Sequence, residues 1–180
     1  YAGGSFTEQF DVWNAFSWTS VGGGGTTADP ETTLELTGLT GGWVTSWDDE
    51  GETSWTVGFL GTANTDEAAV TALAVTPSGT EHLLVAGTFS GNVDLDPGDD
   101  LDTASAADGA FVVALDSSGT HVWGVGLDGD FTPHDVDVDN NGMVFVAGEL
   151  TGSLTIERSV LTSNGGTDAL VLVFDADGNY

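Results

Sequence analysis

Short apolar runs separated by turn residues follow one another along the chain. The runs are rich in Val, Thr and aromatic residues, which favour strands, and the turns are rich in Gly, Asp and Asn. The longest runs, such as residues 170–174, are far shorter than the roughly 20 apolar residues that a membrane-spanning helix needs. The pattern therefore predicts an all-β protein with many tight turns and no transmembrane segment.

One pattern of strands and turns recurs along the chain. Each copy has a strand that contains glycine and, further on, an apolar run that ends in Asp before a turn glycine. The glycine strands are residues 1–3, 85–91 and 146–152, and the apolar runs end at Asp48, Asp116 and Asp175. Trp55 and Trp123 take the same place in the run after the turn, which predicts that both pack between successive units.

Four short strands in about 60 residues per copy predict an antiparallel blade of a β-propeller. We expect a first unit at residues 1–60 with an insertion at about 7–38, followed by units at 61–127 and 128–180. The first unit lacks its first strand, and the third lacks its last. Closed propellers have about four to eight blades, so we expect these three blades to be a segment of a larger propeller. The alternative is a β-sandwich, which does not require repetition of the sequence.

The repeat also carries recognisable motifs. Residues 89–98 read FSGNVDLDPG, residues 108–123 read DGAFVVALDSSGTHVW, and residues 162–168 read TSNGGTD. These motifs resemble the SBBP-like repeats of large secreted bacterial β-propeller proteins. The resemblance implies an extracellular or cell-surface location and little about activity. The third copy departs from it, because residues 153–159 replace the Asp-Pro-Gly turn.

Charge excludes some functions and leaves others open. The chain has 29 Asp and Glu against one Lys or Arg, Arg158, and a formal net charge of -28. Nucleic-acid binding is excluded, because phosphate contacts need clustered Lys and Arg. The acidity fits a protein of a salt-loving organism, a secreted protein kept soluble by charge, or one stabilised by divalent cations. The absence of Cys removes disulfides and thiolate metal sites.

Asp137, Asp139 and Asn141 match the opening of a calcium-binding loop, D-x-[DN]-x-[DN]-G. A complete EF-hand also needs Glu at the twelfth loop position, which is Gly148 here, so an EF-hand is rejected. The alternative is an ordinary hairpin turn, where Asp and Asn are common.

A second acidic cluster surrounds the Pro-Gly turn of the second unit. Its candidate ligands for calcium are Asp94, Asp96 and Asp99. Carboxylates this close repel one another unless they are solvated or bound to a metal, so a solvated loop is the alternative.

The insertion occurs in the first unit only and is rich in aromatic residues. Phe10, Trp13, Phe16 and Trp18 lie close together ahead of a run of glycines. Exposed Trp side chains would bind a glycan or anchor a protein partner. The alternative is a small core that packs over its own blade, since large aromatic residues are usually buried.

These observations favour a non-enzymatic extracellular or cell-surface scaffold that mediates binding, adhesion or assembly. Its partners would be other protein chains or the remaining blades of a longer chain. The alternative is a propeller-based hydrolase or lyase that uses calcium and paired carboxylates. No nucleophile motif of the G-x-S-x-G type is present, and carboxylates are so abundant that a pair at catalytic separation carries no evidence.

Overall fold

The computed structural model describes residues 1–7, 10–12, 32–34, 39–77, 82–98 and 102–180. Within these residues the chain is all-β, and none of their secondary-structure elements is a helix. The strands are β1 (Ala2–Phe6), β2 (Phe10–Val12), β3 (Thr32–Leu34), β4 (Gly41–Trp47), β5 (Thr53–Leu60), β6 (Glu67–Val75), β7 (Leu83–Asp94), β8 (Thr103–Leu115), β9 (His121–Val138), β10 (Val144–Ile156) and β11 (Ser159–Phe174). In the part of the chain so described, no helix could cross a membrane.

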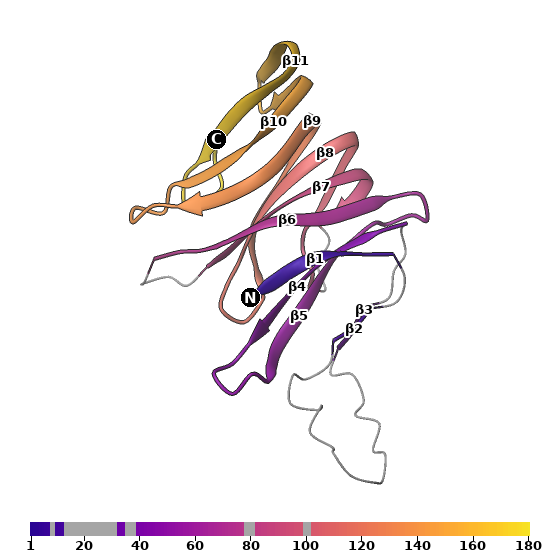
Figure 1. Ribbon diagram of the computed structural model, residues 1–180, viewed down its shortest axis with the longest axis vertical. Helices are drawn as coiled ribbons and strands as arrows, with labels where there is room; N and C mark the ends of the chain where they lie inside the picture. Colours follow the sequence, from indigo (N-terminus) through magenta and orange to yellow (C-terminus); the bar gives the residue numbers. More distant parts are fainter. Residues whose placement is uncertain (8–9, 13–31, 35–38, 78–81, 99–101) are drawn as a thin grey trace.

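All neighbouring strands are antiparallel and form three sheets (Figure 1). One sheet has the order β1-β4-β5, and a second has the order β11-β10-β9-β8-β7-β6. A small hairpin of β2 and β3 lies within the predicted insertion. The all-β prediction is confirmed, and none of the three sheets closes on itself.

Strand β9 joins two parts of the six-stranded sheet. Its first half, residues 121–128, pairs with β8, whereas residues 131–138 pair with β10. The predicted boundary between the second and third units, at residues 127 and 128, falls within this strand. The chain stays extended and changes partner near Gly129, which has a φ of 138° and packs so closely on Ser153 that a side chain would overlap the Ser153 carbonyl oxygen.

Both faces of the central strands are buried, so the strands form three layers. We call β1-β4-β5 the first layer, β6-β7-β8 with residues 121–127 of β9 the middle layer, and residues 131–138 with β10 and β11 the third layer. Phe111, Val113 and Leu115 of β8 share a buried cluster with residues of the first layer. The alternate residues Val112 and Ala114 share another cluster with the third layer.

This alternation has a direct physical cause. Successive residues of a strand point to opposite faces, so β8 can be apolar at every position only where both faces are covered. Residues 109–115 of β8 are all buried. The first and third layers lie at opposite ends of this arrangement (Figure 1).

Candidate functional site

Among the described residues the same aspartate turn occurs four times, beginning at Asp48, Asp116, Asp139 and Asp175. In each turn the Asp Oδ1 atom accepts hydrogen bonds from the backbone N–H groups two residues on, at 2.8–3.0 Å, and four residues on, at 2.8–2.9 Å. The glycine three residues on donates to the Asp carbonyl oxygen at 3.0–3.1 Å and has a φ of 81–83°. A left-handed φ is unfavourable for other residues, which explains the glycine.

In three of these turns the pKa of the Asp carboxyl group is lowered. Hydrogen bonds to the ionised form lower the pKa of Asp116, Asp139 and Asp175 below the ordinary Asp value. The largest cause is the Ser118 hydroxyl for Asp116, the Met143 N–H for Asp139 and the Asn179 side-chain amide for Asp175. These carboxylates therefore act as structural acceptors within their own turns.

Two of the turns also receive a tryptophan from the preceding layer. The Nε1 atom of Trp55 donates to the Ser117 carbonyl oxygen at 2.9 Å, across 62 residues of sequence. A Cβ atom on Gly119 would lie 2.7 Å from the Trp55 ring, so the indole packs directly on the turn glycine. This is the packing between units that the repeated tryptophan predicted.

The second contact repeats the first one layer further along. Trp123 Nε1 donates to the Ala176 carbonyl oxygen at 3.0 Å, and a Cβ on Gly178 would lie 2.7 Å from the Trp123 ring. In both contacts the indole N–H donates to the carbonyl oxygen of the residue that follows the turn Asp. In both, the indole ring also packs on the glycine three residues after that Asp. The contact between first and middle layers is thus reproduced between middle and third layers.

The candidate calcium loop adopts this turn geometry. Asp139 Oδ1 accepts the two turn hydrogen bonds, and its Oδ2 accepts from Asn141 Nδ2 at 3.0 Å. Asp137 Oδ1 accepts from the backbone N–H of Val138 at 2.8 Å. No group of three His, Cys, Asp or Glu side chains suited to a metal occurs among the residues whose positions are described. Calcium binding by Asp137, Asp139 and Asn141 stays a prediction.

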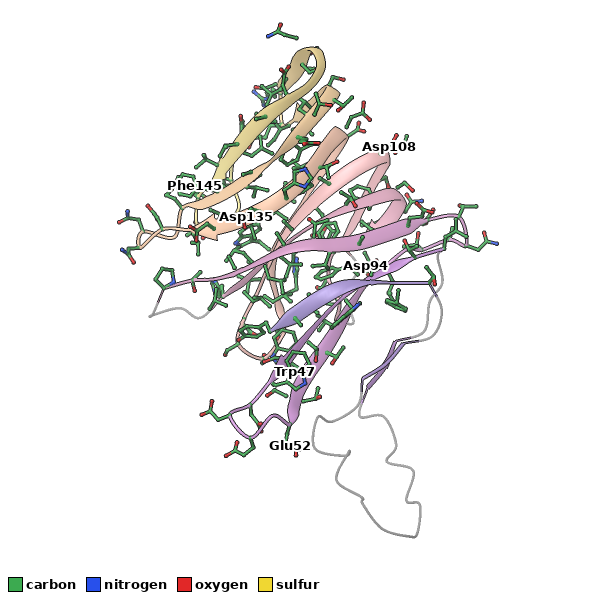
Figure 2. The ribbon with its side chains drawn as sticks, in the orientation of Figure 1. Trp47, Glu52, Asp94, Asp108, Asp135 and Phe145 are labelled. Carbon is green, nitrogen blue, oxygen red and sulfur yellow. The ribbon has the colours of Figure 1, made fainter. Side chains whose placement is uncertain are left out.

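The second acidic cluster is organised by hydrogen bonds and by a histidine. Asp94 Oδ1 accepts from the backbone N–H groups of Asp96 and Asp102, each at 3.1 Å (Asp94 is labelled in Figure 2). His121 lies between two carboxylates, with Nδ1 3.7 Å from Asp96 Oδ2 and Nε2 3.8 Å from Asp102 Oδ2. Asp99 lies outside the described residues.

Sequence reasoning did not connect His121 with this cluster. The pairing joins the start of β9 to the loop between β7 and β8, and no short-range spacing reveals it. The His121 Nε2 atom is buried and has no hydrogen-bond partner among the described residues. The geometry makes the imidazole a contact between this loop and β9.

The aromatic residues of the insertion are only partly placed. Phe10 is the first residue of β2. Trp13, Phe16 and Trp18 lie outside the described residues, so their role in binding a glycan or a protein stays a prediction.

A cleft of about 550 Å³ opens where the three layers meet. Its acidic residues are Glu67 of β6, Asp108 of β8 and Asp130 of β9. Hydroxyl groups from the loop before β4 and from β7, β9 and β10 complete its polar lining, namely Thr40, Thr88, Ser90, Thr132 and Thr151. The lining offers oxygen acceptors and no Lys or Arg, so its chemistry suits cationic or hydroxyl-rich ligands.

Comparison with known protein families finds no family that matches this chain, and comparison with curated proteins finds no match.

Proposed function

We propose that this chain is a non-enzymatic scaffold of the β-propeller type that mediates binding or assembly. The observation that carries the proposal is the repeated contact between an indole and the aspartate turn of the next layer. A contact that recurs at equivalent positions favours a modular stack of like units, as in repeat proteins.

The burial of the middle layer favours propeller blades over a β-sandwich. Each sheet of a two-layer sandwich buries one face against its partner and leaves the other facing outward. Here β8 contributes Phe111 and Val113 to one buried cluster and Val112 and Ala114 to another. Blades packed face to face around a central axis account for both clusters.

The cleft supports a role in binding. Glu67, Asp108 and Asp130 come from three different strands, so the fold rather than a single loop assembles their carboxylates. Binding sites are often formed by groups that a rigid scaffold brings together from different strands. The proposed extracellular or cell-surface location rests on the resemblance of the repeat to secreted propeller proteins.

The substitution Trp123→Ala tests the proposed modular contact. We expect it to lower the free energy of unfolding by about 2 kcal/mol or more, because it removes packing on Gly178 and the hydrogen bond to Ala176. Val122→Ala is the matched control, since Val122 precedes Trp123 in β9 and is 43% exposed. Denaturant unfolding would measure both, and equal losses in the two variants would contradict the proposal.

A further inference from the structure

The outer faces of the first and third layers correspond to faces of the middle layer that its two neighbouring layers cover. The aspartate turns fix this equivalence, because Asp116 follows β8, Asp175 follows β11 and Asp48 follows β4. Counting back from the turns places Val171 and Val173 of β11 at the positions of Val112 and Ala114 of β8. The same count places Trp43 and Trp47 of β4 at the positions of Phe111 and Leu115.

The outer face of the third layer is open, and it combines apolar side chains of β10 and β11 with the exposed Asp135 and Asp137 of β9, which pair with Ala147 and Phe145. Val112 is 0% exposed beneath the third layer, whereas its counterpart Val171 is 57% exposed. Leu84 of β7 is 1% exposed, whereas Phe145, its counterpart in β10, is 38% exposed (Phe145 is labelled in Figure 2). The register confirms the counterparts, since Leu84 pairs with Ala114 and Phe145 pairs with Val173.

The outer face of the first layer carries aromatic residues. Val44 of β4 lies in the cluster shared with the middle layer, so Trp43, Thr45 and Trp47 lie on the opposite face, where Thr45 is buried, Trp43 is half-buried and Trp47 is exposed. Trp47 is 37% exposed, although its counterpart Leu115 is 0% exposed against the first layer. Each end of the stack thus presents strands equivalent to those that pack between layers within the chain, with Asp135 and Asp137 of β9 at the positions of Ala72 and Ala74 of β6.

We propose that a second copy of this chain binds head to tail, with the outer face of its first layer on the outer face of the third layer. Two copies would supply six layers, which lies within the roughly four to eight blades of closed propellers. In such a heterologous contact each copy uses two different surfaces. Copies joined in this way form a closed ring when the rotation that relates one copy to the next returns to the first copy. The inference rests on the proposed function and names its partner.

Two properties of the chain favour a second copy as the occupant. Both faces are present in one chain, and the interface continues the packing between the first and middle layers and between the middle and third layers. The outer face of the third layer is not free of charge, because it carries Asp135 and Asp137 of β9 and Glu149 of β10. Repulsion between copies of net charge -28 opposes the contact, so association strengthens with added salt.

Sedimentation equilibrium of the whole 180-residue chain, over a range of concentrations in 0.15 M and 1 M NaCl, tests this inference. We expect reversible dimers that tighten at the higher salt. Val171→Lys and Trp47→Lys should each weaken dimerisation by about ten-fold or more, because each places a charge in both contacts of the ring. Val75→Lys, on β6, is the control and should leave dimerisation unchanged; Val75 is 48% exposed.

Mixing the two variants distinguishes head-to-tail binding from other arrangements. An equimolar mixture of Val171→Lys and Trp47→Lys chains contains one unaltered contact per ring and should associate more tightly than either variant alone. Loss of dimers with Val171→Lys but not with Trp47→Lys would indicate pairing of two third layers and would overturn the proposal. A chain that stays monomeric under all conditions would also overturn it.

The proposed function is tested separately by the unfolding of Trp123→Ala. A monomeric chain in which Trp123→Ala is destabilised far more than Val122→Ala would refute head-to-tail binding and leave the modular scaffold intact. Equal destabilisation of these two variants would refute the scaffold itself.

Discussion

Strands β8 and β11 share a sequence pattern and a turn but differ in their surroundings. In both, an apolar run ends in an aspartate turn, at Asp116 and at Asp175. The apolar run of β8 is buried on both faces, whereas β11 buries Leu172 and Phe174 and exposes Val171. The comparison shows that the repeat specifies the strand and its turn, while the neighbouring layers decide which side chains are buried.

A lysine placed at equivalent positions gives the largest expected difference. Val112→Lys should lower the free energy of unfolding by about 3–5 kcal/mol, because it leaves a charge unpaired in the core. At concentrations at which the chain is monomeric, Val171→Lys should change it by less than about 0.5 kcal/mol, because that side chain then faces solvent. Denaturant unfolding would measure both, and a similar loss in the two variants would show that the strands do not differ as described.

A pair of glycines separates the cost of backbone strain from the cost of losing the indole contact. Gly119 and Gly166 have φ of 81° and 78°, but Gly119 packs on Trp55, while a Cβ on Gly166 would meet nothing within 4 Å. Gly166→Ala should cost about 1 kcal/mol of unfolding free energy. Gly119→Ala should cost about 2–3 kcal/mol, because the indole must also move. Thermal and denaturant unfolding would test this, and equal costs would mean that the indole contact contributes little.

Acid should weaken the turns. A carboxyl group whose pKa is lowered by folding stabilises the fold above the ordinary Asp pKa of about 3.9, and this stabilisation is lost as the pH falls through the folded value. We therefore expect the unfolding free energy to decrease as the pH falls below about 4.

The substitution Asp116→Ala should make this decrease shallower. Asp177→Ala is the control, because the turn hydrogen bond of residue 177 comes from its backbone N–H, which the substitution keeps. Urea unfolding at several pH values would measure the slope. An unchanged slope in Asp116→Ala would show that the turn carboxylate does not contribute to the acid sensitivity.

Salt should have a smaller effect that is shared by all layers. Raising the ionic strength from 0.01 M to 0.15 M shortens the Debye length from about 30 Å to about 8 Å and screens the repulsion within a chain of net charge -28. We expect stabilisation of about 1 kcal/mol, or a rise in Tm of roughly 2–4 °C. Calorimetry would detect it, and a flat response would contradict the electrostatic argument. A further rise with micromolar calcium that is lost in Asp137→Ala would support the predicted calcium loop.

Local patterns predicted much of this structure, and long-range packing explains the remainder. The positions of Asp48, Asp116 and Asp175 could be predicted because the turn depends on hydrogen bonds within five residues. The packing role of Trp55 and Trp123 followed from their repeated position.

Other features had no local signal. The predicted unit boundary at residues 127 and 128 falls within the single strand β9, whose halves pair with different neighbours. The position of His121 between Asp96 and Asp102 depends on how the loop after β7 folds over β9. Such contacts join residues far apart in sequence, so they are determined by the packed sheet rather than by spacing.

The exchange of the indole N–H protons with solvent tests the repeated contact most directly. In a chain with labelled tryptophan, the N–H groups of Trp55 and Trp123 should exchange slowly and at similar rates, because each donates to the carbonyl of a neighbouring turn. The N–H of Trp47, which is 37% exposed, should exchange much faster. Exchange of Trp55 or Trp123 as fast as that of Trp47 would contradict a stack built on one repeated contact.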